Sequence, residues 1–173
     1  MKLLSLAIAC FLIVSCAQHL DQPSANLIDS VAAKKEIGAM LDSFNLAAAN
    51  ADFDRYFNYY TADAVFLGTD ATEYWGLPAF KAYAKPHFDK KKAWNFTSVD
   101  RHIYFGKYAD IAWFDELLST QMKICRGSGV VVNENGSWKL KQYVLSATVP
   151  NSLVDSVTVM KTAEEDALLQ KLR

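Results

Sequence analysis

The chain has 173 residues, of which 51% are hydrophobic, and its formal net charge is -1 at pH 7. This length and composition suit one compact globular domain and exclude a low-complexity or disordered chain. A balanced charge without a basic block also argues against nucleic acid as a partner.

The N-terminal segment has the pattern of an export signal. Met1 and Lys2 give a short basic start, and an apolar run extends from Leu3 to Val14. This run is shorter than the roughly 20 residues that a helix needs to span a bilayer, but it is typical of a secretory signal peptide. The sequence therefore predicts that residues 1–15 are a signal peptide.

The end of this segment, Ile13-Val14-Ser15-Cys16, resembles the lipobox of bacterial lipoproteins. The resemblance implies cleavage before Cys16 and a diacylglycerol on its thiol. The mature protein would then be anchored by its lipid to a bacterial membrane. The expected location is the outer membrane, with the domain facing the periplasm. The alternative is an ordinary signal peptide in which Cys16 is incidental.

Three cysteines, Cys10, Cys16 and Cys125, bear on the same prediction. Cys10 leaves with the signal peptide and Cys16 carries the lipid, so that Cys125 has no partner for an intramolecular disulfide. Because Cys125 lies within a predicted strand, we expect it to be a small buried hydrophobic residue.

Three helices are predicted in the first half of the chain, after a polar tether over residues 16–30. Apolar residues recur at steps of three and four over residues 31–48, which indicates an amphipathic helix ending near Asn50. Asp52 is a suitable N-cap for a second, short helix. A third helix begins near Pro78, because proline is favoured in the first turn.

Strands make up much of the rest of the domain. The segment Asp63–Gly68 has the pattern of a strand, residues 69–76 that of a polar loop, and Trp94–Phe105 that of a long alternating strand. Three further alternating runs over residues 111–118, 125–132 and 138–146 form a meander, and Asn135-Gly136 marks a hairpin between the last two. Residues 31–151 should therefore form one α+β domain with helices on one face of a curved antiparallel sheet, followed by a helical extension over residues 152–173.

Alternation also assigns faces to the polar residues of the meander. Lys139 and Lys141 must face solvent, which places Gln142 on the opposite, inward face of its strand. Asp115 and Glu116 are neighbours, so one carboxylate faces inward whichever face is buried. Arg126 is the expected partner of that inward carboxylate, either as a clamp for an anionic ligand or as an ion pair that fixes the register of the strands.

Several stretches resemble the SnoaL-like branch of the nuclear transport factor 2-like superfamily over about residues 34–151. These stretches are Asp63-Ala64-Val65-Phe66-Leu67-Gly68-Thr69-Asp70, Glu73 with Trp75-Gly76, Ala112-Trp113-Phe114-Asp115-Glu116, Arg126-Gly127-Ser128-Gly129, and Trp138-Lys139-Leu140 through Ser146 to Val149-Pro150-Asn151. The resemblance implies a cone-shaped fold whose bent sheet and helices leave a pocket between them. Members include ketosteroid isomerase, scytalone dehydratase and polyketide cyclases as well as proteins without known catalysis, so the fold does not settle the function.

The candidate site draws on the loop, the third helix and the meander. Carboxylates or a histidine that could abstract a proton are Asp70, Glu73, His87 and Asp115. Residues expected to contact a ligand are Glu73, Trp75, His87, Trp94, Trp113, Asp115, Glu116, Arg126 and Gln142. Ordinary core packing explains Trp113 and Trp138 at least as well, and a hydrogen bond to the backbone would explain His87. The scattered histidines lack acidic partners at ligand spacing, so we predict neither a metal site nor a cofactor.

Three functions fit these features. The first is a lipoprotein that binds a small, flat, anionic organic molecule in the pocket. The second is an acid/base enzyme of the isomerase, dehydratase or cyclase type that acts next to a carbonyl group. The third is an interaction module that forms a homodimer through the sheet and has no ligand.

Overall fold

The computed structural model describes residues 30–106 and 110–173. The predicted signal peptide, Cys16 and almost all of the predicted tether lie outside these residues. No helix within the described part of the chain is long and apolar enough to cross a membrane.

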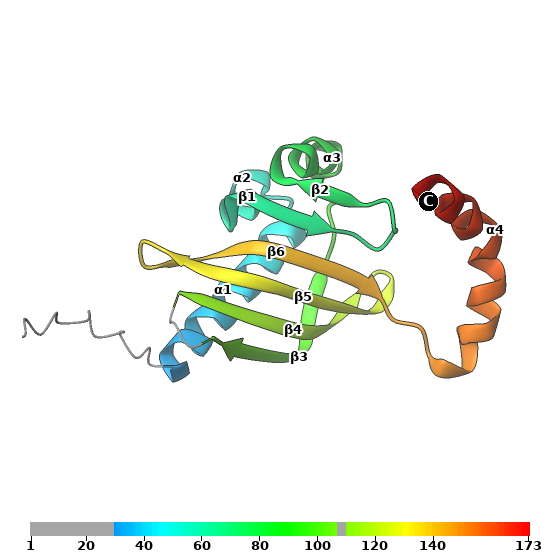
Figure 1. The fold of residues 1–173 in the computed structure, drawn as a ribbon. Coiled ribbons are helices and arrows are strands. Elements are labelled where there is room, and N and C mark those ends of the chain that lie inside the picture. The colour runs from blue at the N-terminus through cyan, green and yellow to red at the C-terminus, as the bar shows by residue number, and fades with distance from the viewer. Residues whose placement is uncertain (1–29, 107–109) are drawn as a thin grey trace, which may run out of the picture.

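Three helices pack on one face of a six-stranded sheet, and a fourth comes after the last strand (Figure 1). The helices are α1 (Ser30–Ala49), α2 (Phe53–Asn58), α3 (Leu77–Asp89) and α4 (Val154–Leu172), with a short 3-10 helix, η1 (Asn151–Leu153), before α4. The strands are β1 (Tyr60–Leu67), β2 (Tyr74–Gly76), β3 (Phe96–Phe105), β4 (Ile111–Thr120), β5 (Lys123–Glu134) and β6 (Ser137–Ala147). The predicted α+β class with helices on a curved sheet is confirmed.

The strand order across the sheet is β2-β1-β6-β5-β4-β3. All neighbouring pairs are antiparallel except β1 and β6, which run parallel. The sheet is therefore mixed rather than wholly antiparallel, because the chain passes through α3 and four further strands before β6 returns beside β1. The loop predicted over residues 69–76 is also shorter than expected, since its last three residues form β2.

The helices pack against the sheet through a largely aromatic core. Ile37, Leu41 and Phe44 of α1 are buried, and Asp52 caps α2 by accepting a hydrogen bond from the backbone N–H of Arg55 at 3.1 Å. Burial of such apolar side chains is the main source of stability in a domain of this size. Cys125 is also fully buried, as expected.

The hairpin between β5 and β6 has the predicted turn. Asn135 and Gly136 both have positive φ angles, 54° and 82°, as a type I′ turn requires. The register between the two strands then shifts, since Val131 pairs with Leu140 but Val130 pairs with Gln142. Lys141 is thus one extra residue, a β-bulge.

This bulge reverses the alternation along β6, and it makes the predicted inward position of Gln142 wrong. Trp138 and Leu140 are buried before the bulge, and Tyr143 and Leu145 are buried after it. Gln142 is exposed on the outer face of the sheet. A strict period of two cannot hold across an inserted residue.

The last helix stands apart from the other elements. In Figure 1, α4 (orange to red) lies away from the sheet and from the three other helices. None of its residues is buried. The segment after the sheet is therefore helical, but it adds nothing to the core of the domain.

Candidate functional site

A hollow of about 160 Å³ lies between α3 and the β1–β2 end of the sheet. Most of its wall is aromatic or aliphatic, with a few polar side chains among these residues. The lining residues are Phe66, Gly68, Thr69, Glu73, Trp75, Phe80, Tyr83, Trp94, Phe96, Gln121, Met122 and Leu145. Wider hollows, such as the one between Ala51 and Phe88, are more open and more polar, which makes the aromatic hollow the candidate site.

The aromatic rings of this wall lie nearly parallel to one another. Phe80 stacks on Phe66 with 4.1 Å between the ring centroids and an angle of 10° between the planes. Trp75 lies at 8° and Trp94 at 16° to Phe80, with centroids 5.9 and 6.0 Å away. Tyr83 of α3 stacks on Trp75, with 4.4 Å between the ring centroids. A wall of parallel ring planes favours a flat ligand that can adopt the same orientation.

Glu73 brings a carboxylate to this wall. Its side chain folds back over Gly68, where an added Cβ would lie 2.0 Å from Glu73 Oε2 and 2.9 Å from Glu73 Cβ. The backbone N–H of Asp70 donates to Glu73 Oε2 at 3.3 Å. Glycine at position 68 is therefore what allows the Glu73 carboxylate to turn toward the hollow.

The charge of the Glu73 carboxylate also affects Tyr83. Its pKa is raised, mainly because the phenol is partly desolvated and also because the negative charge of Glu73 disfavours the phenolate. Tyr83 therefore stays protonated near neutral pH and presents a hydroxyl beside Glu73.

Two other candidates lie near the hollow without lining it. His87 is exposed at the end of α3, with its ring centroid 5.4 Å from that of Tyr83 and 6.4 Å from that of Trp94. Asp70 is exposed in the loop and accepts hydrogen bonds from both the hydroxyl and the backbone N–H of Thr72, at 2.6 and 2.8 Å. These bonds lower the pKa of Asp70, which makes it a weaker base.

Four of the predicted residues lie on the outer face of the sheet. Asp115 Oδ1 lies 3.5 Å from His102 Nδ1 and 3.7 Å from Arg126 Nη1, and all three side chains are substantially exposed. Trp113 is 46% exposed and stacks on Tyr104. Together with Gln142, these residues are separated from the hollow by the sheet, so the structure does not bring Trp113, Asp115, Arg126 and Gln142 to it.

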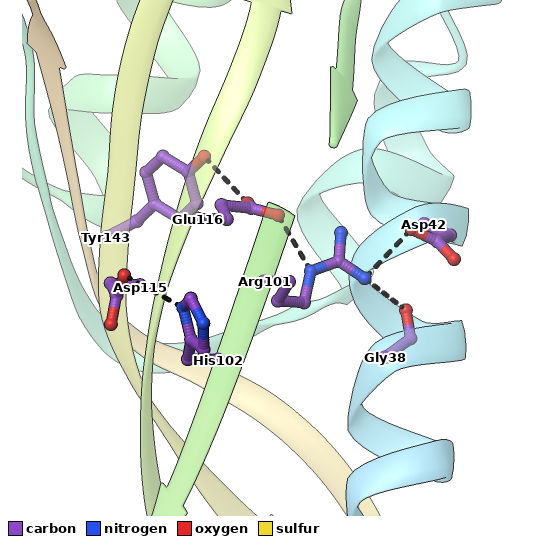
Figure 2. A network of polar contacts seen from close by, with 7 residues as sticks. All are labelled: Gly38, Asp42, Arg101, His102, Asp115, Glu116 and Tyr143. Carbon is purple, nitrogen blue, oxygen red and sulfur yellow. Dashed lines mark hydrogen bonds and ion pairs between the residues drawn. The ribbon is translucent and has the colours of Figure 1, made fainter. Parts of the chain in front are cut away.

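The inward carboxylate is Glu116, and its partner is Arg101 rather than Arg126 (Figure 2). Arg101 Nε donates to Glu116 Oε2 at 2.7 Å, and Tyr143 Oη donates to Glu116 Oε1 at 3.5 Å. On the other side, Arg101 Nη1 donates to Gly38 O at 3.0 Å and lies 2.9 Å from Asp42 Oδ1. Glu116 therefore belongs to a buried network that joins α1 to the sheet.

The network reaches the wall of the hollow through the ring of Tyr143. Tyr143 packs parallel to Phe66, with centroids 5.9 Å apart and planes at 3°. The pKa of Tyr143 is raised well above its usual value, first because it is buried and then because of the negative charge of Glu116. Glu116 does not itself line the hollow.

Of the lining residues, Glu73, Trp75 and Trp94 were expected from the sequence and its family resemblance, and most of the wall was not. Phe66, Phe80 and Tyr83 fall on a predicted strand or helix stripe, with no signal that these stripes border a cavity. Gln121 and Met122 come from the turn between β4 and β5, which no local pattern brings to α3.

No group of three or more His, Cys, Asp or Glu side chains within residues 30–106 and 110–173 is placed to hold a metal ion. The chemistry that the described side chains offer to the hollow is aromatic contact, the hydroxyl and amide groups of Thr69, Tyr83 and Gln121, and the Glu73 carboxylate.

The fold has many counterparts among solved structures. An NTF2-like protein of unknown function from Pseudomonas putida KT2440 aligns with a TM-score of 0.60 at 16% identity, over 70% of this chain and 90% of that chain. A proposed dehydratase of the NTF2-like family from Streptomyces avermitilis gives 0.60 at 15% identity, over 70% and 99%. A proposed scytalone dehydratase from Novosphingobium aromaticivorans gives 0.58 at 13% identity, over 69% and 87%. Such identities show the shared fold alone.

No curated protein matches the sequence significantly. A family model described as SnoaL-like domain matches residues 37–150, from the middle of α1 to the end of the sheet. That match spans well over half of the chain, and with the NTF2-like fold it shows that this protein belongs to the SnoaL-like family.

Proposed function

We propose that this SnoaL-like domain binds a small, flat organic molecule in the hollow between α3 and the β1–β2 end of the sheet. The observation that carries the proposal is the wall of nearly parallel rings around about 160 Å³ of space. A buried apolar cavity of about 150 Å³ is known to take up benzene, so this hollow suits one aromatic ring. The half-open mouth leaves room for a substituent to project toward solvent.

Indole is a suitable first probe because it is flat, neutral and similar in size. Indole at millimolar concentration should raise the melting temperature of the full-length chain, since a ligand that binds only the folded state stabilises it. Trp75→Leu should abolish the shift, because it removes one ring of the wall. Trp113→Leu makes the same substitution on the outer face and should leave the shift intact. Equal loss in both variants, or no shift in the parent, would contradict the proposal.

Acid/base catalysis is a second candidate, and one observation favours it: a carboxylate, Glu73, lies within the aromatic wall beside a protonated phenol, Tyr83. Glu73 would take a proton next to a carbonyl group and Tyr83 would donate a hydrogen bond to the carbonyl oxygen. Among the catalytic candidates predicted from the sequence, this favours Glu73.

The two candidates differ in proton exchange. Acetophenone in D₂O is a probe that reports proton abstraction without knowledge of the natural substrate. An enzyme of this kind should accelerate exchange of its methyl protons, and Glu73→Gln should remove the acceleration by a factor of at least about 100. A protein that only binds its ligand should leave the exchange rate of acetophenone unchanged, as the parent and as the Glu73→Gln variant.

We also propose that the chain is exported and lipid-anchored through Cys16. The support is the sequence Ile13-Val14-Ser15-Cys16 after the apolar run. In a bacterial host the protein should fractionate with membranes, and Cys16→Ser should release it. Mass spectrometry of the mature N-terminus would reject the proposal if residue 16 carried no lipid.

A further inference from the structure

We infer that the hollow is selective for an organic cation, an aromatic or alkyl ammonium compound, rather than for an anion or a neutral molecule. This inference rests on the proposed binding function and specifies the charge of its ligand. It also replaces the anionic ligand expected from the sequence, because that expectation depended on Arg126, which lies on the outer face of the sheet.

The charge of the hollow favours a cation. Among the described residues that line it, Glu73 is the only charged side chain, and neither lysine nor arginine takes part. An anion placed here would meet a carboxylate with no cation to offset it. A cation would meet its counter-ion in a partly desolvated setting, where the attraction is stronger than in water.

Glu73 also has no counter-ion within ion-pair distance in the described part of the chain. The nearby lysines of α3 are used elsewhere. Lys81 Nζ lies over the ring of Phe57 at 5.6 Å, and Lys85 Nζ lies over Phe53 at 5.7 Å and pairs with Asp89. The hydrogen bond that Glu73 accepts from Asp70 comes from a neutral backbone N–H. The negative charge of Glu73 is therefore left for a ligand.

The aromatic wall favours a cation for a separate reason. Tryptophan, tyrosine and phenylalanine rings attract an ammonium group within about 6 Å, and cages of such rings are a recurrent means of holding quaternary ammonium groups. Trp75, Trp94 and Tyr83 supply the rings that interact most favourably.

Three single-ring probes of similar size test the inference: benzylammonium, benzyl alcohol and benzoate, which differ in charge. Their dissociation constants for the full-length chain can be measured by NMR titration at pH 7 and low salt. Benzylammonium should bind at least about tenfold more tightly than benzyl alcohol, a difference of about 1.4 kcal/mol, and benzoate should bind most weakly.

Glu73→Gln is the decisive variant, because the amide keeps the shape of the side chain and an acceptor for the Asp70 N–H. It should reduce the preference for benzylammonium over benzyl alcohol to about twofold or less while the affinity for benzyl alcohol is retained. Glu134→Gln, in the exposed β5–β6 hairpin, makes the same change of net charge and should keep the full preference.

The outcomes separate the two proposals. If benzyl alcohol and benzoate bind as tightly as benzylammonium, the charge inference is overturned and the binding function stands. A preference that survives Glu73→Gln also overturns it, because the charge would then come from another place. If none of the three probes binds, both proposals fall together.

Discussion

Arg101 of β3 donates its Nε–H to Glu116 of β4 at 2.7 Å, and Glu116 is only 1% exposed. The other end of the same guanidinium holds Gly38 and Asp42 of α1, as Figure 2 shows. A charge buried to this degree is tolerated because it is paired and hydrogen-bonded. The pair thereby fixes α1 against the sheet, close to the rings that form the wall of the hollow.

Loss of Arg101 should be costly. Arg101→Met leaves Glu116 as an uncompensated buried charge, and we expect the free energy of unfolding to fall by about 3–5 kcal/mol. Arg126→Met removes the exposed partner of Asp115 at 3.7 Å and should cost less than about 1 kcal/mol. Denaturant unfolding of the two variants measures both values. Equal effects would show that Glu116 is stabilised by something other than Arg101.

The stability of the domain should decline steeply above about pH 10. Burial raises the pKa values of Tyr56, Tyr60 and Tyr143 above those of the unfolded chain. A group with a raised folded-state pKa stabilises the fold below the unfolded pKa, near 10, and loses that contribution as the pH rises toward the folded value. Each buried phenol should therefore remove about 1.4 kcal/mol per pH unit above about pH 10.

Tyr56→Phe tests the origin of this decline. It removes one ionisable group, and the loss of stability between about pH 10 and 11 should be shallower by the contribution of one proton. Tyr104→Phe, at an exposed position on the outer face, should leave the slope unchanged. Identical slopes in the parent and in Tyr56→Phe would mean that lysine titration, not the buried phenols, governs the alkaline limit.

Gly68 should be needed for the charge of the hollow. In Gly68→Ala the new Cβ would lie 2.9 Å from Glu73 Cβ, so the Glu73 side chain must move away. We expect the preference for benzylammonium to fall at least about fivefold, in the same direction as in Glu73→Gln. Gly76→Ala is the matched control, because its Cβ would have nothing within 4 Å. Unchanged selectivity in Gly68→Ala would show that the position of the Glu73 side chain does not determine which ligand charge the hollow prefers.

Two glycines in other elements should respond in opposite directions to replacement by alanine. The Cβ of Gly129→Ala would lie 2.3 Å from the backbone oxygen of Gln142, which cannot yield, so a loss of about 1–3 kcal/mol or more is expected. The Cβ of Gly38→Ala in α1 would make an ordinary contact of 3.9 Å with Arg101, and alanine favours a helix interior by about 0.5–1 kcal/mol. Calorimetric melting of the two variants gives the signs directly.

Local periodicity predicts the elements well but not which face of each strand is buried. The hairpin at Asn135-Gly136 and the N-cap at Asp52 depend on neighbouring residues alone, and both are confirmed. The register shifts at Lys141 in β6 and between Ser98 and Asp100 in β3 depend on pairing with another strand. Nothing in the local sequence marks these positions, so alternation carried across them reverses the predicted face.

The same limit applies to the site. Glu73 and Trp75 were expected at the pocket because the family resemblance places the loop after the first strand at the pocket rim, and both line the hollow. Arg101 shares its strand face with Ile103 and Phe105, and that placement of a charge among apolar residues was a usable signal for a buried ion pair. That Glu116 pairs with Arg101 and not with Arg126 depends on the position of β3 at the edge of the sheet, which is a property of the whole topology.

The separateness of α4 has a consequence for how the protein melts. A helix of 19 residues without a buried side chain has little more than its backbone hydrogen bonds and pairs such as Lys161–Glu165 to sustain it. Its helical content should fray gradually on warming, while the domain holds until one cooperative transition. The far-ultraviolet circular dichroism should therefore drift well before the near-ultraviolet bands of the aromatic core change at all.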